Sequence, residues 1–305
     1  MGTQFWWFFD VISVAVILIA VFLAGKKGFV KTFVMLLGCI SAMILGVSLS
    51  SAFSGSLYDT VIKQNNIKKL DKALSEDDMI RKTKVSIEGF GYNVKVDETE
   101  LSKIFEKGED ILPELYKYVN NINGKKVDTE AGFNEKMTQG FADMTNTIVT
   151  EALGGNIGEA SAEAVEGDMT SFAEMMQLIE AGTDGEDVSY RKAAEFMEEK
   201  FTGKASSEMI KIMTFTITAL LIIIIAGFIE HRINSNREYG EDTAISYHAI
   251  GALFGVAEGI IILFVIAAAI RALAEIGNSE MIMFNGDTIK KTYVFKYIYS
   301  FAEKL

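Results

Sequence analysis

Two long apolar runs separated by a very short turn constrain this chain more than any other feature of its sequence. Phe5–Ala24 is interrupted only by Asp10, and Phe29–Phe53 only by Lys31. A helix rises about 1.5 Å per residue, so about twenty residues cross the roughly 30 Å hydrocarbon core of a bilayer. Each run is therefore long enough to span a membrane. The turn is too short to leave the membrane surface, so we expect a helical hairpin.

The turn also predicts orientation. It consists of Gly25, Lys26, Lys27, Gly28 and Phe29. Lys and Arg in short loops are enriched on the cytoplasmic side of membranes. We therefore expect this turn inside the cell and the N-terminus outside.

The same pattern recurs in the second half of the chain. Met209–Ile229 and Ala249–Ile270 are two further apolar runs, joined by the short polar segment Glu230–His248 with its basic residues. The sequence thus predicts an all-α polytopic membrane protein with four transmembrane helices in two hairpins. We place the first hairpin at residues 1–53 and the second at 206–272, with both connecting turns in the cytoplasm.

The segment between the hairpins carries the net charge of the protein. Ser54–Ala205 contains 18 Lys and Arg against 30 Asp and Glu, a net charge of −12, and the remainder contains 11 of each. If both turns are cytoplasmic, this insert and both termini lie outside. An acidic surface repels nucleic acid. We expect an acidic extracytoplasmic domain at 54–205 that binds no nucleic acid.

Most of this insert has helical periodicity. Asn134–Leu153 and Met169–Glu180 read as amphipathic helices. Lys84–Val96 instead alternates apolar and polar residues around a glycine-containing centre, which predicts a short β-hairpin. The single cysteine, Cys39, falls in the second apolar run, so disulfides cannot stabilise the insert.

The tail, residues 273–305, contains a regular apolar stripe. Ile289, Tyr293, Tyr297 and Phe301 recur every four residues, and lysines lie off that stripe. This spacing predicts an amphipathic helix. Its apolar face could pack on the extracytoplasmic domain, lie on the outer membrane surface, or dock a partner.

Small residues in the spans predict close helix packing. Gly251, Gly255 and Gly259 share one face of the fourth run, and Gly38 and Gly46 form a weaker version in the second. Such faces let two helices approach closely in a membrane. The pattern does not distinguish packing within one subunit from packing in a homo-oligomer.

Three charges lie inside the predicted spans. Glu258 stands about 14 Å into the fourth run, where an ionisable group is costly unless protonated, paired or hydrated. Lys31 enters its run from the same side, and we hypothesise a Lys31–Glu258 pair. Asp10, near the outer end of the first run, is interpreted as a helix-end or water-facing group.

Catalytic motifs are not evident. Both histidines, His231 and His248, flank the second cytoplasmic turn, so the insert cannot hold a Ser/His/Asp or Cys/His site. The acidic stretch 184–187 (DGED) could attract calcium weakly, but a solvated turn is the simpler interpretation. We predict no catalytic residue, no cofactor and no metal site, and hence a protein that is not an enzyme.

Several of these pieces resemble the colicin V production protein family (CvpA), bacterial inner-membrane proteins with four spans. The matching pieces are Asp10 with its apolar run, residues 25–31 (GKKGFVK), Leu37-Gly38, residues 251–255 (GALFG) with Gly259, and 288–299 (TIKKTYVFKYIY). The chain departs from the family in having Glu258 at a position that is usually basic or apolar. It also lacks the asparagine-proline ending after Tyr299, and its insert is much longer than in short members.

The resemblance implies a non-enzymatic, multi-pass protein of the bacterial inner membrane, with termini and insert extracytoplasmic. Such a protein would support colicin V production, that is, toxin (bacteriocin) biosynthesis and secretion, or cell-envelope homeostasis. It would act through contacts with membrane lipid and with membrane or secreted proteins. The alternative is an oligomeric channel or transporter subunit that uses the glycine face and Glu258.

Overall fold

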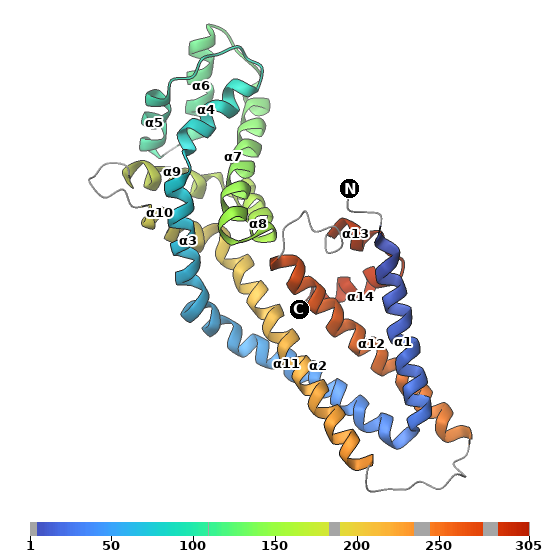
Figure 1. The fold of residues 1–305 in the computed structure, drawn as a ribbon. Coiled ribbons are helices and arrows are strands. Elements are labelled where there is room, and N and C mark those ends of the chain that lie inside the picture. The colour runs from blue at the N-terminus through green and yellow to red at the C-terminus, as the bar shows by residue number, and fades with distance from the viewer. Residues whose placement is uncertain (1–4, 109, 183–189, 235–244, 277–285, 305) are drawn as a thin grey trace. The chain divides into compact units, whose positions relative to one another are not determined.

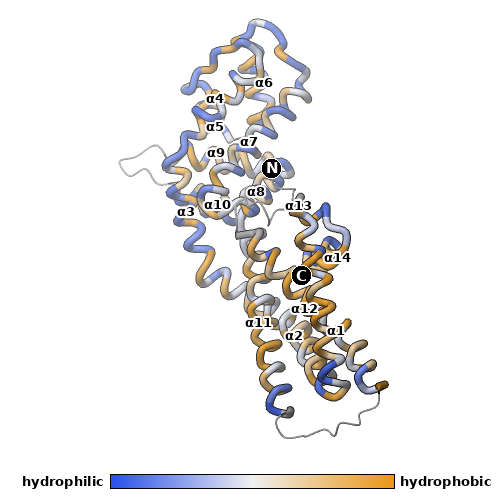
Figure 2. The backbone as a smooth tube through the Cα atoms, turned by 45° about the vertical axis from the view of Figure 1, so that its right-hand side comes forward, coloured by the Kyte–Doolittle hydropathy of each residue, from blue (hydrophilic) through white to orange (hydrophobic). Residues whose placement is uncertain are grey.

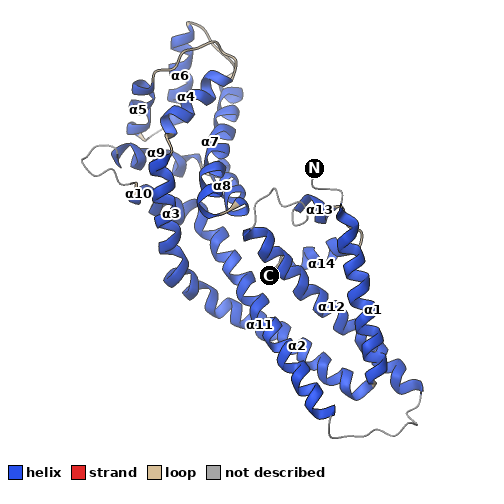
Figure 3. Ribbon diagram, viewed as in Figure 1, coloured by secondary structure: helices blue, strands red, loops and turns tan. Residues whose placement is uncertain are grey.

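The computed structural model describes residues 5–108, 110–182, 190–234, 245–276 and 286–304. All regular structure in these residues is helical, and no β-strand occurs among them (Figure 3). Two short π-helical segments, η2 (Tyr58–Ile62) and η3 (Glu198–Thr202), interrupt the α-helices. The α-helices are α1 (Trp6–Lys27), α2 (Phe29–Leu57), α3 (Lys63–Glu76), α4 (Met79–Gly89), α5 (Glu98–Lys107), α6 (Ile111–Asn123), α7 (Glu130–Leu153), α8 (Gly155–Gly167), α9 (Met169–Gly182), α10 (Arg191–Met197), α11 (Gly203–Asn234), α12 (Ile245–Ile276), α13 (Gly286–Lys290) and α14 (Phe295–Ala302).

Four helical stretches are long and apolar enough to cross a membrane. They are Trp6–Lys27, Phe29–Glu76, Arg191–Arg232 and Ile245–Leu273, and Figure 2 shows their apolar residues in orange. Large apolar side chains on these helices face outward: Phe22 is 67% exposed, Phe228 69% and Leu253 69%. Apolar surface of this extent is typical of helices that face lipid. The predicted all-helical class, with four helices long and apolar enough to cross a membrane, is therefore confirmed.

The chain divides into two compact units. The membrane unit comprises Met1–Leu57 and Ser207–Leu305, and the acidic domain comprises Tyr58–Ser206.

In the membrane unit, α1 runs beside α12, and α12 also contacts α2 and α14 (Figure 1). A core of aromatic and small residues lies between these helices and α11, and it includes Phe9, Ala42, Phe215, Ala268 and Phe295. Small side chains allow the close approach on which helix association in lipid depends.

In the acidic domain, α7 is the central helix and contacts α3, α4, α6 and α8. Phenylalanines fill the core, and Phe141 stacks on Phe172 with ring centroids 4.5 Å apart. Local signals set the helix ends: the Asp97 side chain caps α5, and Gly108 ends it with φ of 67°. The domain therefore has an apolar core of its own.

The predicted β-hairpin at Lys84–Val96 is wrong. Residues 79–89 form α4, whose first turn is capped by the Asp78 side chain, 2.9 Å from the Arg81 amide. Met79, Thr83 and Ile87 recur every four residues and are buried. Val85, which created the apparent alternation, is 62% exposed. The four-residue spacing of the buried side chains therefore predicts the observed helix. Val85, which lies between them in sequence, faces solvent.

Candidate functional site

The three glycines of α12 form its contact with α1. A Cβ atom on Gly251 would lie 2.8 Å from the Ala24 carbonyl oxygen, and one on Gly255 would lie 2.6 Å from the Ala24 Cβ. A Cβ on Gly259 would lie 3.1 Å from the Ala20 Cβ. Only glycine permits this backbone approach without displacement. The α12 glycine face is thus occupied by another helix of the same chain.

The glycines of α2 have the same role against α11. A Cβ on Gly38 would lie 2.2 Å from the Ala226 Cβ, and one on Gly46 would lie 3.0 Å from the Phe215 ring. In the structure, both glycine faces mediate packing within the chain.

The turn between α1 and α2 is covered by the first residues of α12. Gly28 has φ of 79°, and a Cβ there would collide with the Tyr247 ring at 1.9 Å. The Tyr247 hydroxyl accepts a hydrogen bond from the Val30 amide at 3.3 Å. His248 Nδ1 lies 2.8 Å from the Gly25 carbonyl oxygen, which requires Nδ1 to donate. Gly28 therefore serves both the backbone geometry of the turn and its packing.

A charge cluster lies at this end of the membrane unit. Lys27 Nζ is 2.9 Å from Glu230 Oε1 and 2.9 Å from Oε2. The Glu230 side chain is only 8% exposed, against 37% for Lys27. Glu258, on α12, is also buried. An ion pair and a further buried carboxylate therefore belong to the membrane unit.

The hypothesised Lys31–Glu258 pair stays a prediction. The ion pair that the structure shows at the end of α1 joins Lys27 to Glu230. Lys27 belongs to the last turn of α1, the helix that packs along the face of α12 carrying Glu258, whereas Lys31 lies beyond the turn on α2. The sequence placed Glu230 in the polar segment between the two spans, so its ion pair was not predicted. The available signal was an acidic residue next to His231 and Arg232 at the end of a span.

Asp10 is a helix-end group, but the helix that it caps is α14. Its carboxylate accepts hydrogen bonds from the backbone amides of Tyr293 at 2.7 Å, Val294 at 2.8 Å and Phe295 at 3.0 Å. These amides precede or begin α14, where backbone donors lack partners within the helix. Asp10 therefore attaches the tail to α1.

Within the acidic domain, sequence reasoning missed a buried carboxylate. Glu198 has no exposed surface. Its Oε1 accepts hydrogen bonds from the Tyr58 hydroxyl at 2.7 Å and from Asn66 Nδ2 at 3.0 Å, and its Oε2 accepts one from the Thr202 hydroxyl. Glu198 begins η3 and Tyr58 begins η2, and π-helical segments of this kind often occur at functional positions. Three donors satisfy this carboxylate, and they link segments that are far apart in the sequence.

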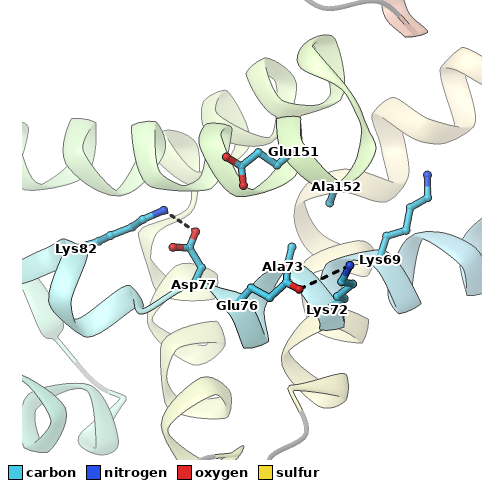
Figure 4. Close-up of a pocket in the computed structure, with 8 residues that line it drawn as sticks. All are labelled: Lys69, Lys72, Ala73, Glu76, Asp77, Lys82, Glu151 and Ala152. Atoms are coloured by element: carbon cyan, nitrogen blue, oxygen red, sulfur yellow. Dashed lines mark hydrogen bonds and ion pairs between the residues drawn. The ribbon is translucent and has the colours of Figure 1, made fainter.

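The acidic domain also contains a groove of about 490 Å³ (Figure 4). Its charged lining includes the ion pairs Lys82–Asp77 and Lys72–Glu76. Because three lysines and three carboxylates line it, the groove shows no preference for one sign of ligand charge. The lining residues are Lys69, Lys72, Ala73, Glu76, Asp77, Lys82, Glu151 and Ala152.

Neither a metal site nor a calcium site can be assigned from the structure. No group of three or more His, Cys, Asp or Glu side chains suited to a metal ion occurs among the described residues. The acidic stretch 184–187 lies outside those residues.

Comparison of the chain with protein-family models, with curated proteins and with solved structures gives no match. The resemblance to the CvpA family therefore stays a prediction carried by short motifs. A function for this chain has to be inferred from its own residues and contacts.

Proposed function

We propose that the chain is a non-enzymatic accessory protein of the bacterial inner membrane, similar to CvpA. In this proposal the four spans form two hairpins with the acidic domain inserted between them. The protein supports toxin secretion or envelope homeostasis by presenting that domain to membrane or secreted partners.

The observation that carries this proposal is the close contact between α1 and α12. At Gly251 and Gly255 the backbones approach so closely that even a methyl group would collide with the neighbouring helix. Such a contact leaves no space for a water-filled path between these two helices. It favours a rigid membrane anchor over a pore lined by the glycine face.

The orientation in this proposal follows from the distribution of charge. The Lys26–Lys27 turn and the Lys27–Glu230 ion pair join the end of α1 to the end of α11, next to His231 and Arg232. Short basic segments are retained in the cytoplasm. The opposite ends of the spans, and the acidic domain that follows α2 in sequence, are then extracytoplasmic.

The proposal is tested by deleting the coding sequence in the producing bacterium and measuring export of a secreted bacteriocin together with survival under envelope stress. Complementation should restore both traits with the wild-type protein and with a Gly227→Ala control, because a Cβ on Gly227 meets no atom within 4 Å. A deletion strain with normal export and normal stress resistance would contradict the proposal.

The charge cluster favours a second candidate, an ion-conducting or transporting subunit. Lys27, Glu230 and Glu258 place one cation and two carboxylates within or at the ends of the spans, where charges often mark ion or proton pathways. Reconstituted protein in vesicles should then conduct ions or protons, and Glu258→Gln should reduce that flux. Absence of flux in the wild-type protein, with no effect of Glu258→Gln, would exclude this candidate.

A further inference from the structure

The tail presents a row of exposed aromatic side chains. Tyr293 is 69% exposed, Tyr297 62% and Phe301 63%, whereas Ile289, the first member of the predicted stripe, is buried. The residues of α14 that face the rest of the membrane unit are instead Phe295 and Ala302. The rings of Tyr297 and Phe301, four residues apart on α14, and that of Tyr293 just before the helix are therefore left uncovered.

The opposite face of α14 is held firmly. Asp10 accepts the three amide hydrogen bonds described above, and Phe9 stacks on Phe295 with ring centroids 5.1 Å apart. At the other end of the helix, Arg271 Nη1 donates to the Ala302 carbonyl oxygen at 2.8 Å. Contacts to both α1 and α12 thus fix the direction in which the aromatic row points.

Lysines accompany the exposed rings. Lys296 Nζ lies 5.3 Å from the centre of the Tyr297 ring, and Lys304 Nζ lies 5.5 Å from that of Phe301. Residues 288–304 contain four lysines and one glutamate in a chain whose net charge is −12. This face is therefore locally basic and aromatic.

The row continues the lipid-facing surface of α1. The Trp6 and Tyr293 rings meet edge to face with centroids 5.3 Å apart, and the neighbouring Trp7 is 48% exposed. Further along α1, Val11 and Leu18 are 55% and 61% exposed. Trp and Tyr concentrate at membrane–water interfaces, and lysines there extend their charge toward headgroups. The surface that continues into the aromatic row is thus the one expected to contact lipid.

We propose that Tyr293 and α14 form a membrane-surface anchor. Tyr297 and Phe301 insert at the boundary between headgroups and acyl chains, about 5–10 Å into the interface. Lys296 and Lys304 contact the phosphates of anionic phospholipids. This proposal requires only that the four helices span the membrane, so it stands independently of the proposed function.

The test uses the full-length protein with the photo-crosslinking residue p-benzoylphenylalanine at position 297 or 301, reconstituted in bilayers of phosphatidylcholine and phosphatidylglycerol. The control carries the same residue in place of Val85, an exposed residue of the acidic domain. Illumination should give lipid adducts, identified by mass spectrometry, at both tail positions and few at position 85. Adduct yields at 297 and 301 no higher than at 85 would overturn the proposal. Crosslinks from these positions to another protein in living cells, in place of lipid, would also overturn it.

The lysines are tested by comparing the two lipids among the adducts. Phosphatidylglycerol should be enriched over its share of the bilayer, and Lys296→Gln with Lys304→Gln should lower that enrichment, by up to about fivefold per lysine. The matched control is Lys125→Gln with Lys126→Gln, which removes the same charge from exposed positions of the acidic domain. Equal enrichment in the wild-type protein and in the Lys296/Lys304 variant would overturn the role of the lysines.

Discussion

Gly255→Ala places one methyl group in the contact between α1 and α12. The new carbon would lie 2.6 Å from the Ala24 Cβ, and 2.8 Å from both the Ala20 carbonyl oxygen and the Val21 Cα. Carbon atoms in van der Waals contact are separated by about 3.5–4.0 Å, so the two helices must move apart by roughly 1 Å. Two of the three obstructing atoms belong to the backbone of α1 and cannot rotate away.

The matched control is Gly227→Ala, because a methyl group there meets nothing within 4 Å. Both substitutions gain the same helix propensity, about 1 kcal/mol in favourable cases, so comparing the two variants cancels that gain. Overpacking costs about 1–3 kcal/mol. The free energy of unfolding of Gly255→Ala should therefore be lower than that of Gly227→Ala by about 1–3 kcal/mol.

Reversible unfolding in mixed detergent micelles measures this difference, followed by the fluorescence of Trp6 and Trp7, both of which lie on α1. Equal unfolding free energies for the two variants would refute the close packing of α1 on α12.

Three further substitutions test the polar contacts. Asp10→Ala removes the acceptor of three amide hydrogen bonds, so hydrogen exchange at Tyr293, Val294 and Phe295 should accelerate by more than about tenfold. Hydrogen exchange followed by mass spectrometry measures this change. Unchanged protection of these amides would contradict the capping role of Asp10. Glu198→Ala leaves three donors without their acceptor and should lower the unfolding free energy by about 3–5 kcal/mol in thermal melts. Glu198→Gln keeps one acceptor oxygen and should lower it by about 1–2 kcal/mol. An alanine variant as stable as the wild type would count against the hydrogen-bond network of Glu198. The hydrogen bond from Lys136, together with those from the Thr129 amide and Tyr92, holds the pKa of Asp128 below its ordinary value. Because the folded-state pKa is depressed, the stabilisation from Asp128 is present above the unfolded-state pKa. It is lost as the pH falls through the folded-state pKa. Thermal melts of Asp128→Asn should therefore show a smaller loss of stability on acidification than the wild type, and identical acid dependence would exclude a contribution from Asp128.

The spans could be predicted from sequence because a membrane forces the backbone to form its hydrogen bonds locally, so twenty apolar residues suffice to identify a helix. Gly251, Gly255 and Gly259 were recognisable for a similar reason, since their spacing alone places them on one face. Their partner, α1, was not evident, because nothing local to α12 distinguishes α1 from a second subunit.

The polar contacts depended on residues far apart in the chain. Asp10 is bonded to residues more than 280 positions away, and Glu198 to Tyr58 across 140 positions. No periodicity reveals such pairs.

At Lys84–Val96 the two-residue period of a strand and the helical period both fitted the sequence. Burial of Met79, Thr83 and Ile87 favoured the helical period.

The central claim is that the acidic domain is presented outside the cell while the two-lysine turn stays inside. Single cysteines at position 126 of the acidic domain and at position 26 of the turn test it in intact cells with a membrane-impermeant maleimide, since both positions are exposed and the native Cys39 is buried. The account predicts labelling at 126 and none at 26 until the membrane is permeabilised. Labelling at 26 but not at 126 in intact cells would contradict it.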